Sequence, residues 1–269
     1  MKLRVLGAIA LVALAAAPAM AADVPVPVPV YVPPPVVVIP GWAGLYFGAT
    51  VGGHWSKDDI TTTTSVANYG AAGAAALDAL TPVSITAKGA IAGVQAGYNF
   101  QFGRVVAGIE ADVSWLAGTN TRTLVVPGLA RGNATTVALS NSPQGSVLVT
   151  LRPRLGITFD AVLAYVTGGL AFETVKTTDA VVANAIETTN DSTSHTGWTF
   201  GGGLEYALPK GWLLKAEYLY VSIGIFDVTI GCVSGAGFTC VTAADVVVHH
   251  KYTDNIFRVG VSHLFAGPL

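Results

Sequence analysis

Charged side chains are scarce in this chain: of its 269 residues, only 11 % are Asp, Glu, Lys or Arg, against roughly 25 % in ordinary soluble domains. The net charge is −2 and no basic cluster occurs, so the chain lacks the electrostatic footprint of a nucleic-acid-binding protein. After residue 40 it also lacks a run of about 20 apolar residues, which a transmembrane helix needs. Yet 52 % of its residues are hydrophobic. The chain is therefore apolar without the pattern of a helical membrane protein.

The first 22 residues have the three parts of a secretory signal peptide. Lys2 and Arg4 form a basic start, residues 5–17 form an apolar stretch, and residues 19–21 (A-M-A) match the small-residue cleavage pattern. A membrane anchor is the alternative, but the apolar stretch is short for one. We expect residues 1–22 to direct export and then to be removed.

Residues 23–41 are rich in proline, beginning D-V-P-V-P-V-P-V-Y-V-P-P-P. Alternating prolines prevent the hydrogen bonding of a sheet and favour an extended polyproline II helix. At about 3.1 Å per residue, such a segment spans roughly 50 Å. Two interpretations stay open: a semi-rigid periplasmic linker, or a disordered leader without a task of its own.

Cysteine is almost absent, and its two occurrences, Cys232 and Cys240, lie close together in a Gly-rich segment. In an exported protein this spacing favours a local disulfide. Two free thiols are the alternative. A metal site is disfavoured, because no second pair of Cys or His residues stands beside them at a ligand-like spacing.

From Trp42 onward, apolar residues alternate with polar or small ones in eight separate segments. These segments lie at residues 45–55, 92–100, 109–115, 147–157, 162–173, 198–208, 212–220 and 257–265. A period of two is typical of β-strands with one apolar face. Strands of 9–11 residues cross a bilayer when they are tilted. The pattern therefore predicts eight strands.

Two features predict that the apolar faces point outward, toward lipid. The signal peptide delivers the chain to the cell envelope, and aromatic residues such as Trp55, Trp115, Trp198 and Trp212 lie near the segment ends, as in the girdles of membrane barrels. Short connections, at about residues 101–104, 160 and 209–211, alternate with long ones. The long connections cover roughly residues 56–86, 117–144, 177–194 and 226–249. Residues 42–269 are thus predicted to form an all-β, eight-stranded, antiparallel up-and-down transmembrane barrel with long extracellular loops.

Sequence motifs at both ends of this region point to a family. The first strand opens with W-A-G-L-Y-F-G at residues 42–48, and the last closes with F-R-V-G-V-S-H-L-F at residues 257–265. With the signal peptide and the Pro-rich leader, these motifs resemble the small outer-membrane barrels of alphaproteobacteria, related to OmpA-like and opacity-type barrels. The resemblance implies a Gram-negative outer membrane, contact with lipid and lipopolysaccharide, and recognition of the last strand by the barrel-assembly machinery. Residues 266–269, which follow the terminal Phe265, depart from the family pattern.

Outward apolar faces place the polar faces inside the barrel. The interior is then expected to contain Gln95, Glu110, Asp112, Arg152, Arg154, Glu173, Glu205, Lys215, Glu217 and Arg258. Charges in a low-dielectric interior must pair, and eight strands leave room for little more than side chains. An ion-pair plug is therefore the preferred interpretation. The alternative is a narrow passive porin, which the inward-facing glycines would favour by leaving free volume. Those glycines are Gly93, Gly97, Gly156, Gly169, Gly201 and Gly203.

No motif for catalysis or for a cofactor occurs. His54, His249 and His250 are expected near one another at the outer rim as polar surface; a metal site there is the alternative, but it would need three or four ligands in a fixed geometry. A rim enzyme using His54 and nearby Ser or Asp residues is a further alternative, for which no recognisable site occurs. The Ala-rich stretch at residues 71–80 is expected to form a short helix. The function predicted is a structural barrel that supports the envelope and carries surface loops able to bind a partner, with no cofactor and no nucleic acid.

Overall fold

A computed structural model describes residues 41–118, 120–130, 133–141, 146–182, 186–231, 241 and 244–266. These residues belong to one compact unit, residues 39–269. The expected signal peptide and all of the Pro-rich leader except Gly41 lie outside the described residues, as do Cys232 and Cys240. The cleavage site, the leader's role and the disulfide therefore stay predictions.

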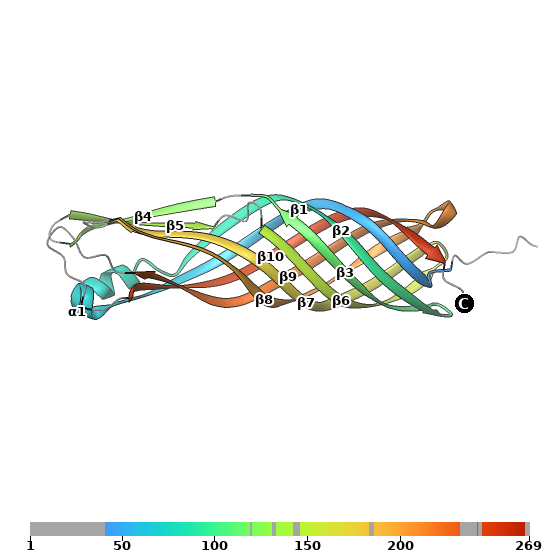
Figure 1. The fold of residues 1–269 in the computed structure, drawn as a ribbon, viewed down its shortest axis with the longest axis horizontal. Helices are drawn as coiled ribbons and strands as arrows, with labels where there is room; N and C mark the ends of the chain where they lie inside the picture. Colours follow the sequence, from blue (N-terminus) through green and yellow to red (C-terminus); the bar gives the residue numbers. More distant parts are fainter. Residues whose placement is uncertain are drawn as a thin grey trace, which may run out of the picture. The chain divides into compact units, whose positions relative to one another are not determined.

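Eight strands close into an antiparallel barrel in which each strand pairs with the next along the chain path and the last pairs with the first (Figure 1). The eight strands are β1 (Gly44–Thr64), β2 (Val83–Phe102), β3 (Val105–Leu116), β6 (Ser146–Phe159), β7 (Val162–Val182), β8 (Ile186–Ala207), β9 (Trp212–Gly231) and β10 (Ala244–Ala266). The predicted fold class is confirmed. The hairpin of β4 (Asn120–Ala130) and β5 (Asn133–Asn141) is added beside the outer part of β7.

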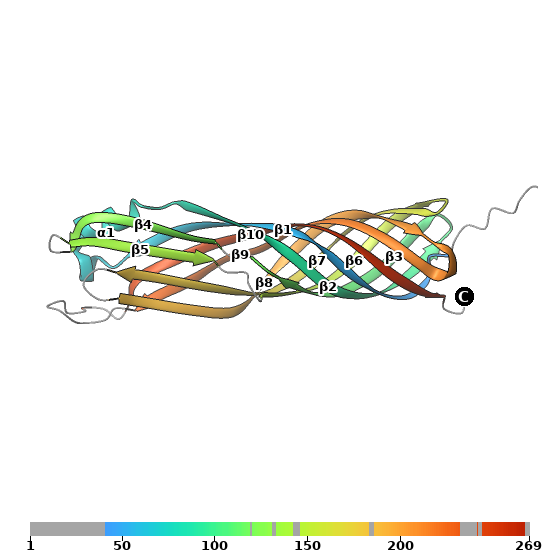
Figure 2. The ribbon, with the colours of Figure 1, turned by 90° about the horizontal axis from the view of Figure 1, so that it is seen from above.

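The strands are staggered, so that they cross the barrel wall at a slant (Figure 2). A path that follows hydrogen-bonded partners from Gly44 on β1 passes through all eight strands and returns to β1 at His54, ten residues further along. This stagger corresponds to a strand tilt of about 40°. An eight-stranded barrel of this tilt has an interior that side chains can fill.

Three tight turns join the strands at the inner end of the barrel, as the sequence predicts. Gly103 lies between β2 and β3, Asp160 between β6 and β7, and the short 3-10 helix η1 (Pro209–Gly211) between β8 and β9. Gly103, Asp160 and Lys210 all have positive φ angles, of 61°, 51° and 64°. Backbone of this kind reverses the chain within two residues, which keeps this end of the barrel short.

The two faces of each strand are inverted relative to a soluble protein. On β1, Leu45, Phe47 and Val51 are exposed, whereas Tyr46 and Thr50 are buried. The same alternation runs along the other barrel strands and confirms the predicted faces. The eleven residues of tilted strand from Leu45 to Trp55 span about 25 Å, which is the height of the apolar band of an outer-membrane barrel.

The outer ends of the strands differ from the prediction. The connections expected as long loops are largely strand: β1 continues to Thr64 and β2 resumes at Val83, and Thr61 to Thr64 pair with Val246 to His249 on β10. β-branched Thr and Val favour strands when a partner is present. The sequence pattern missed this because these stretches lack a clean apolar period.

One helix, α1 (Val66–Asp78), caps the outer end between β1 and β2. Ser65 is its N-cap and accepts a hydrogen bond from the Asn68 N–H. The helix confirms the short Ala-rich helix predicted at residues 71–80, although it begins five residues earlier. Among the described residues, no helix is both long enough and apolar enough to cross a membrane.

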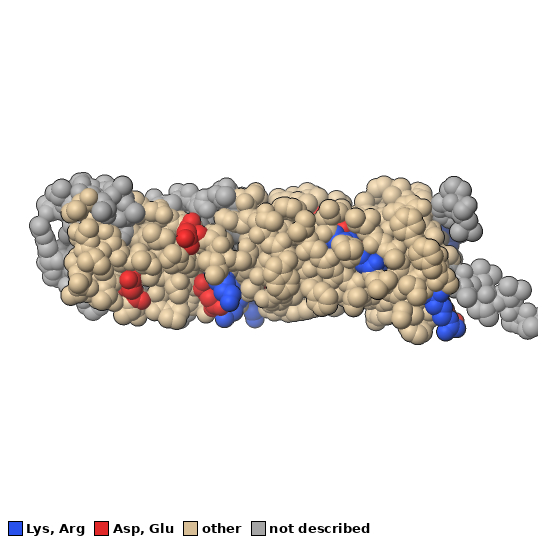
Figure 3. Space-filling view, turned by 90° about the horizontal axis from the view of Figure 1, so that it is seen from below, with Lys and Arg blue, Asp and Glu red and all other residues tan. Residues whose placement is uncertain are grey.

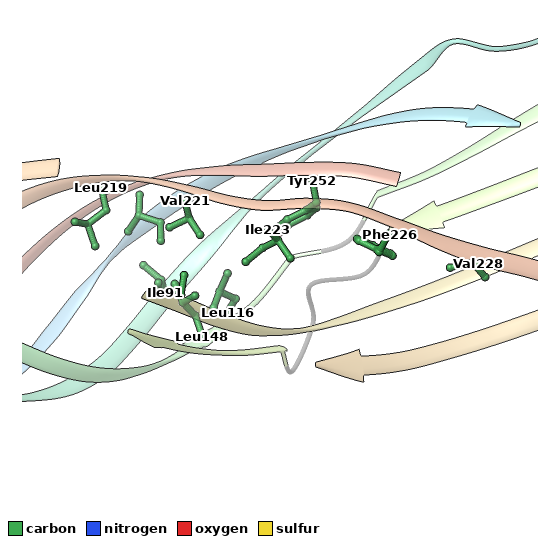
Figure 4. Close-up of a cluster of buried hydrophobic side chains, with 11 residues drawn as sticks. Ile91, Leu116, Leu148, Leu219, Val221, Ile223, Phe226, Val228 and Tyr252 are labelled. Atoms are coloured by element: carbon green, nitrogen blue, oxygen red, sulfur yellow. The ribbon is translucent and has the colours of Figure 1, made fainter. Parts of the chain in front are cut away.

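Apolar side chains inside the barrel form three clusters at different heights. Strand β9 shows their order: Leu213 belongs to an inner cluster, Leu219 through Val228 to a middle cluster, and Ile230 to an outer cluster. In the middle cluster, side chains from β9 meet Ile91, Leu116 and Leu148 from other strands (Figure 4). Between the inner and middle clusters, β9 contributes only Lys215 and Glu217 to the interior.

Candidate functional site

The interior between the inner and middle apolar clusters is a layer of eight charged side chains, which we call the ion-pair layer. Its members are Glu110, Asp112, Arg152, Arg154, Glu205, Lys215, Glu217 and Arg258, each at most 3 % exposed. Because side chains alternate along a strand with a period of two, three pairs of residues two positions apart both face inward: Glu110 and Asp112, Arg152 and Arg154, and Lys215 and Glu217. Four cations meet four anions, so the layer has no net charge when all are ionised.

Glu110 on β3 is the most connected member of the layer. One carboxylate oxygen, Oε1, lies 2.6 Å from Arg152 Nη2 and 2.7 Å from Lys215 Nζ. The other, Oε2, accepts a hydrogen bond of 2.6 Å from the Tyr46 hydroxyl and lies 3.3 Å from Arg154 Nη1. Glu110 therefore joins four strands across the barrel.

Arg258 on β10 connects the remaining two central carboxylates. Its Nη1 lies 2.9 Å from Asp112 Oδ1, and its Nη2 lies 2.7 Å from Glu217 Oε2. Arg152 contacts the same two carboxylates, at 2.9 Å to Asp112 and 3.3 Å to Glu217. Thr150 also donates to Asp112. Two guanidinium groups thus clamp two carboxylates from opposite sides, in the planar geometry that arginine favours.

Two tyrosines cover the inner side of the layer. Arg154 Nη2 lies 2.8 Å from Glu205 Oε2, and its guanidinium carbon lies 4.1 Å from the centre of the Tyr165 ring. The Tyr165 hydroxyl donates a hydrogen bond of 2.8 Å to Glu217. The planar cation therefore lies between a carboxylate and an aromatic face.

Gln95 is the neutral edge of the layer. Its Oε1 accepts a hydrogen bond of 3.0 Å from Lys215, and its Nε2 donates one of 2.9 Å to Ser262. The structure thus brings together nine of the ten residues that the sequence places inside the barrel. Glu173, the tenth, is buried outside this layer.

Tyr46 and Tyr165 are members of the site that the sequence pattern did not predict. Both fall at inward positions of the period, Tyr46 inside the opening W-A-G-L-Y-F-G motif. A tyrosine at an inward position of a barrel filled with ions was the available signal, because a buried phenol needs a polar partner.

The inward glycines do not leave free volume, which corrects the expectation that favoured a porin. A Cβ added at Gly203 would lie 2.6 Å from the Tyr165 hydroxyl, and one at Gly97 would collide with the Tyr46 ring and hydroxyl. One at Gly156 would lie 2.7 Å from Leu163 Cδ1. The space beside these glycines is filled by neighbouring side chains, much as aromatic rings cover glycines in other sheets.

Gly97→Ala is expected to lower the free energy of unfolding by about 1–3 kcal/mol, the usual effect of overpacking a filled interior. The new methyl group meets both Tyr46 and the Ile109 carbonyl oxygen, 2.7 Å away. Urea unfolding of the refolded protein in lipid vesicles measures the change. Gly53→Ala is the matched control, because the nearest atom to its added Cβ is 3.7 Å away. Equal stability of the two variants would contradict this account of the glycines.

The histidines correct a second expectation. His54 and His250 are buried rather than exposed at a loop surface. His54 Nδ1 lies 3.0 Å from Asp254 Oδ2, and His250 Nδ1 lies 2.8 Å from Asp58 Oδ2. They fall on neighbouring strands, as expected, but several residues apart in register. Within the described part of the chain, no group of three or more His, Cys, Asp or Glu side chains could hold a metal ion.

His249 lies on the outer wall, where its Nδ1 is 2.6 Å from Asp227 Oδ1. His263 packs edge-on against Trp212, with ring centres 5.1 Å apart, at the inner end of the apolar band. His263 therefore lies on the lipid-facing wall beside the aromatic residues of the inner end.

A closed antiparallel barrel with exposed apolar side chains on its outer wall and an ion-pair layer inside is the structure of an outer-membrane β-barrel of a Gram-negative bacterium. The chain belongs to the outer membrane protein beta-barrel domain family, whose family model matches residues 7–265. The resemblance noted in the sequence and the expected location are both confirmed.

Two curated relatives and one solved structure are similar to this chain. It is 35 % identical over 189 residues to the 31 kDa outer-membrane immunogenic protein of Brucella melitensis, covering 68 % of this chain and 72 % of the relative. It is 28 % identical over 238 residues to the 25 kDa outer-membrane immunogenic protein of the same organism, covering 87 % and 85 %. Among solved structures, Neisserial surface protein A matches this chain with a TM-score of 0.37 and 15 % identity, over 84 % of this chain and all of that one.

Proposed function

We propose that this protein is a closed structural barrel that supports the integrity of the outer membrane and presents its outer end for interactions at the cell surface. The ion-pair layer is the observation that carries the proposal. An ion crossing the barrel would have to separate guanidinium and carboxylate groups that are 2.6–2.9 Å apart and almost fully buried. Leaving one such charge unpaired in the interior is strongly unfavourable.

Apolar layers on both sides of the ion-pair layer support the same proposal. Trp42, Tyr46 and Leu264 belong to the inner cluster, and Leu219 and Ile256 to the middle one. A water file or a hydrated solute needs polar partners along its whole path. The side chains of these two apolar clusters offer few polar partners. The two clusters and the ion-pair layer therefore act together as a barrier to water and solutes.

The outer end supports the surface part of the proposal. Beyond the level of Trp55, β1 and β10 continue as a paired ladder to Thr64 and Val246. The outer apolar cluster lies inside this extension, and Leu77 of α1 packs into it. A rigid extension that carries loops beyond the membrane is a common platform for recognition. The relatives are named as immunogenic, which agrees with an outer end that is accessible at the surface.

Single-channel recording in a planar bilayer tests the barrier. The refolded protein is expected to give no conductance steps, while a known porin in the same bilayers confirms the assay. Insertion is checked separately by the heat-dependent mobility of the folded barrel on gels. Discrete, reproducible steps whose ion selectivity changes in Arg152→Gln would establish the narrow porin instead.

A rim enzyme is a further outcome that can be tested. Such an enzyme would depend on the histidines of the outer half, so a double variant His54→Gln and His249→Gln would abolish an activity of the intact protein. In a structural barrel, the same variant changes no turnover in protease, lipase or acyltransferase assays.

A further inference from the structure

We propose that Lys57, Lys88 and Lys251 form a binding site for the phosphate groups of the outer-leaflet glycolipid, lipopolysaccharide. The three lysines lie on the outer wall of three neighbouring strands, β1, β2 and β10, immediately beyond Trp55. We call them the lysine patch. The argument rests on their position, their isolation from other cations and the shape of the wall below them.

Register places the three lysines side by side. Trp55 on β1 lies opposite Lys88 on β2, and Lys57 is two residues further out. Asp59, two residues beyond Lys57, lies opposite Lys251 on β10. Diagonal neighbours on one face of a sheet are about 7–8 Å apart. Because the strands tilt, the three ammonium groups lie at similar heights, just beyond the aromatic level.

Among the side chains that the structure describes, the patch is the main positive feature of the outer wall. Of the Lys and Arg residues whose side chains the structure describes, only these three are exposed on the outer side of the aromatic level. Arg104 and Lys210 are exposed at the inner turns, and Arg152, Arg154, Lys215 and Arg258 are buried. Charged groups are sparse on the wall, where tan surface predominates (Figure 3).

Two acidic residues lie beside the patch: Asp227, diagonal to Lys251 on β9, pairs with His249, and Asp59 offers a way to test the patch. Asp59 Oδ1 lies 2.8 Å from Lys57 Nζ, and both side chains are partly exposed, at 39 % and 53 %. Hydrogen bonds from Lys57 and Ser84 hold the pKa of Asp59 below its usual value, so this carboxylate is charged at neutral pH. The three lysines and Asp59 together carry a net charge of +2.

The wall below the patch fits the rest of a glycolipid. Trp55 packs on Tyr218 with ring centres 6.2 Å apart, and the Tyr218 hydroxyl donates to Asn255. Below Trp55, Gly53 leaves a low surface beside exposed Phe257 and Val51. Aromatic rings of this kind lie at the level of lipid headgroups. Acyl chains can lie along the apolar wall while phosphates meet the lysines above.

The test measures binding of diphosphorylated lipid A to the protein in detergent micelles by native mass spectrometry. At low salt, each lysine near an anionic lipid surface raises the binding affinity about fivefold. The triple variant Lys57→Gln, Lys88→Gln and Lys251→Gln is therefore expected to lose up to roughly a hundredfold. Asp59→Asn raises the net charge of the patch to +3 and is expected to bind several-fold more tightly. The inner-rim variant Arg104→Gln with Lys210→Gln is the matched control and should bind as the unmodified protein does.

Three results would overturn the proposal. These are equal binding of a lipid A that lacks both phosphates, unchanged binding in the triple variant, or weaker binding in Asp59→Asn.

Competition with inorganic phosphate shows whether the site binds the phosphate of a lipid or a free phosphate ion. The proposal expects millimolar phosphate to leave lipid A binding unchanged, and full displacement would show a site for the free anion. If the triple variant does not fold, Asp59→Asn and the phosphate-free lipid decide the question.

Discussion

Replacing Glu110 by Gln is expected to lower the free energy of unfolding by about 3–5 kcal/mol, the range observed when one partner of a buried ion pair is removed. The substitution keeps the shape of the side chain but removes the charge that faces Arg152, Arg154 and Lys215. It leaves the ion-pair layer with an uncompensated positive charge. Urea unfolding in lipid vesicles, followed by tryptophan fluorescence, measures the change.

Two further variants show whether the loss comes from buried charge. Asp59→Asn removes a carboxylate from an exposed ion pair and is expected to change stability by less than about 1 kcal/mol. Adding Lys215→Met to Glu110→Gln restores charge balance, so the double variant is expected to be more stable than Glu110→Gln alone. A double variant that loses the sum of both single effects would contradict the charge-balance account.

Val51→Arg is expected to destabilise the barrel by about 2–4 kcal/mol, because it places a cation on the lipid face near the middle of the membrane. Val51 is exposed on β1, roughly midway between Leu45 and Trp55. In a soluble protein, an exposed valine would accept arginine with little effect. The same urea unfolding in vesicles measures the change.

The matched control for Val51→Arg is Thr61→Arg, on the same face of β1 but ten residues further out, beyond the aromatic level. It is expected to change stability by about 0.5 kcal/mol or less. Similar effects at the two positions would mean that the lipid boundary does not lie between them.

The lumen side chains illustrate how far a sequence pattern reaches. A period of two places Glu110 and Asp112 on the same face, and Arg152 and Arg154 likewise, and their burial follows from the outward apolar face. The pattern does not say that Arg152 meets Glu110 or that Arg258 meets Asp112, since these partners lie on β3, β6 and β10. Pairs of that kind depend on the register at which the barrel closes.

Three expectations failed for related reasons. The glycines suggested empty space, but Tyr46 and Tyr165 come from other strands and occupy it. His54 and His250 suggested a polar surface, but their strands continue outward and bury them against Asp254 and Asp58. The outer connections suggested loops, but they pair with neighbours that only the closed barrel supplies. Each error concerns contacts between segments far apart in the chain.

The sequence by itself determined the number of barrel strands, which face of each meets lipid, and the tight turns at the inner end. These depend on alternation and on turn residues, which are local properties of the chain. Only the tertiary structure decided how the buried charges pair, what fills the space beside the inward glycines, and how far the strands extend beyond the membrane. These depend on the stagger with which β1 meets β10, because that stagger sets which side chains from distant strands share one height inside the barrel.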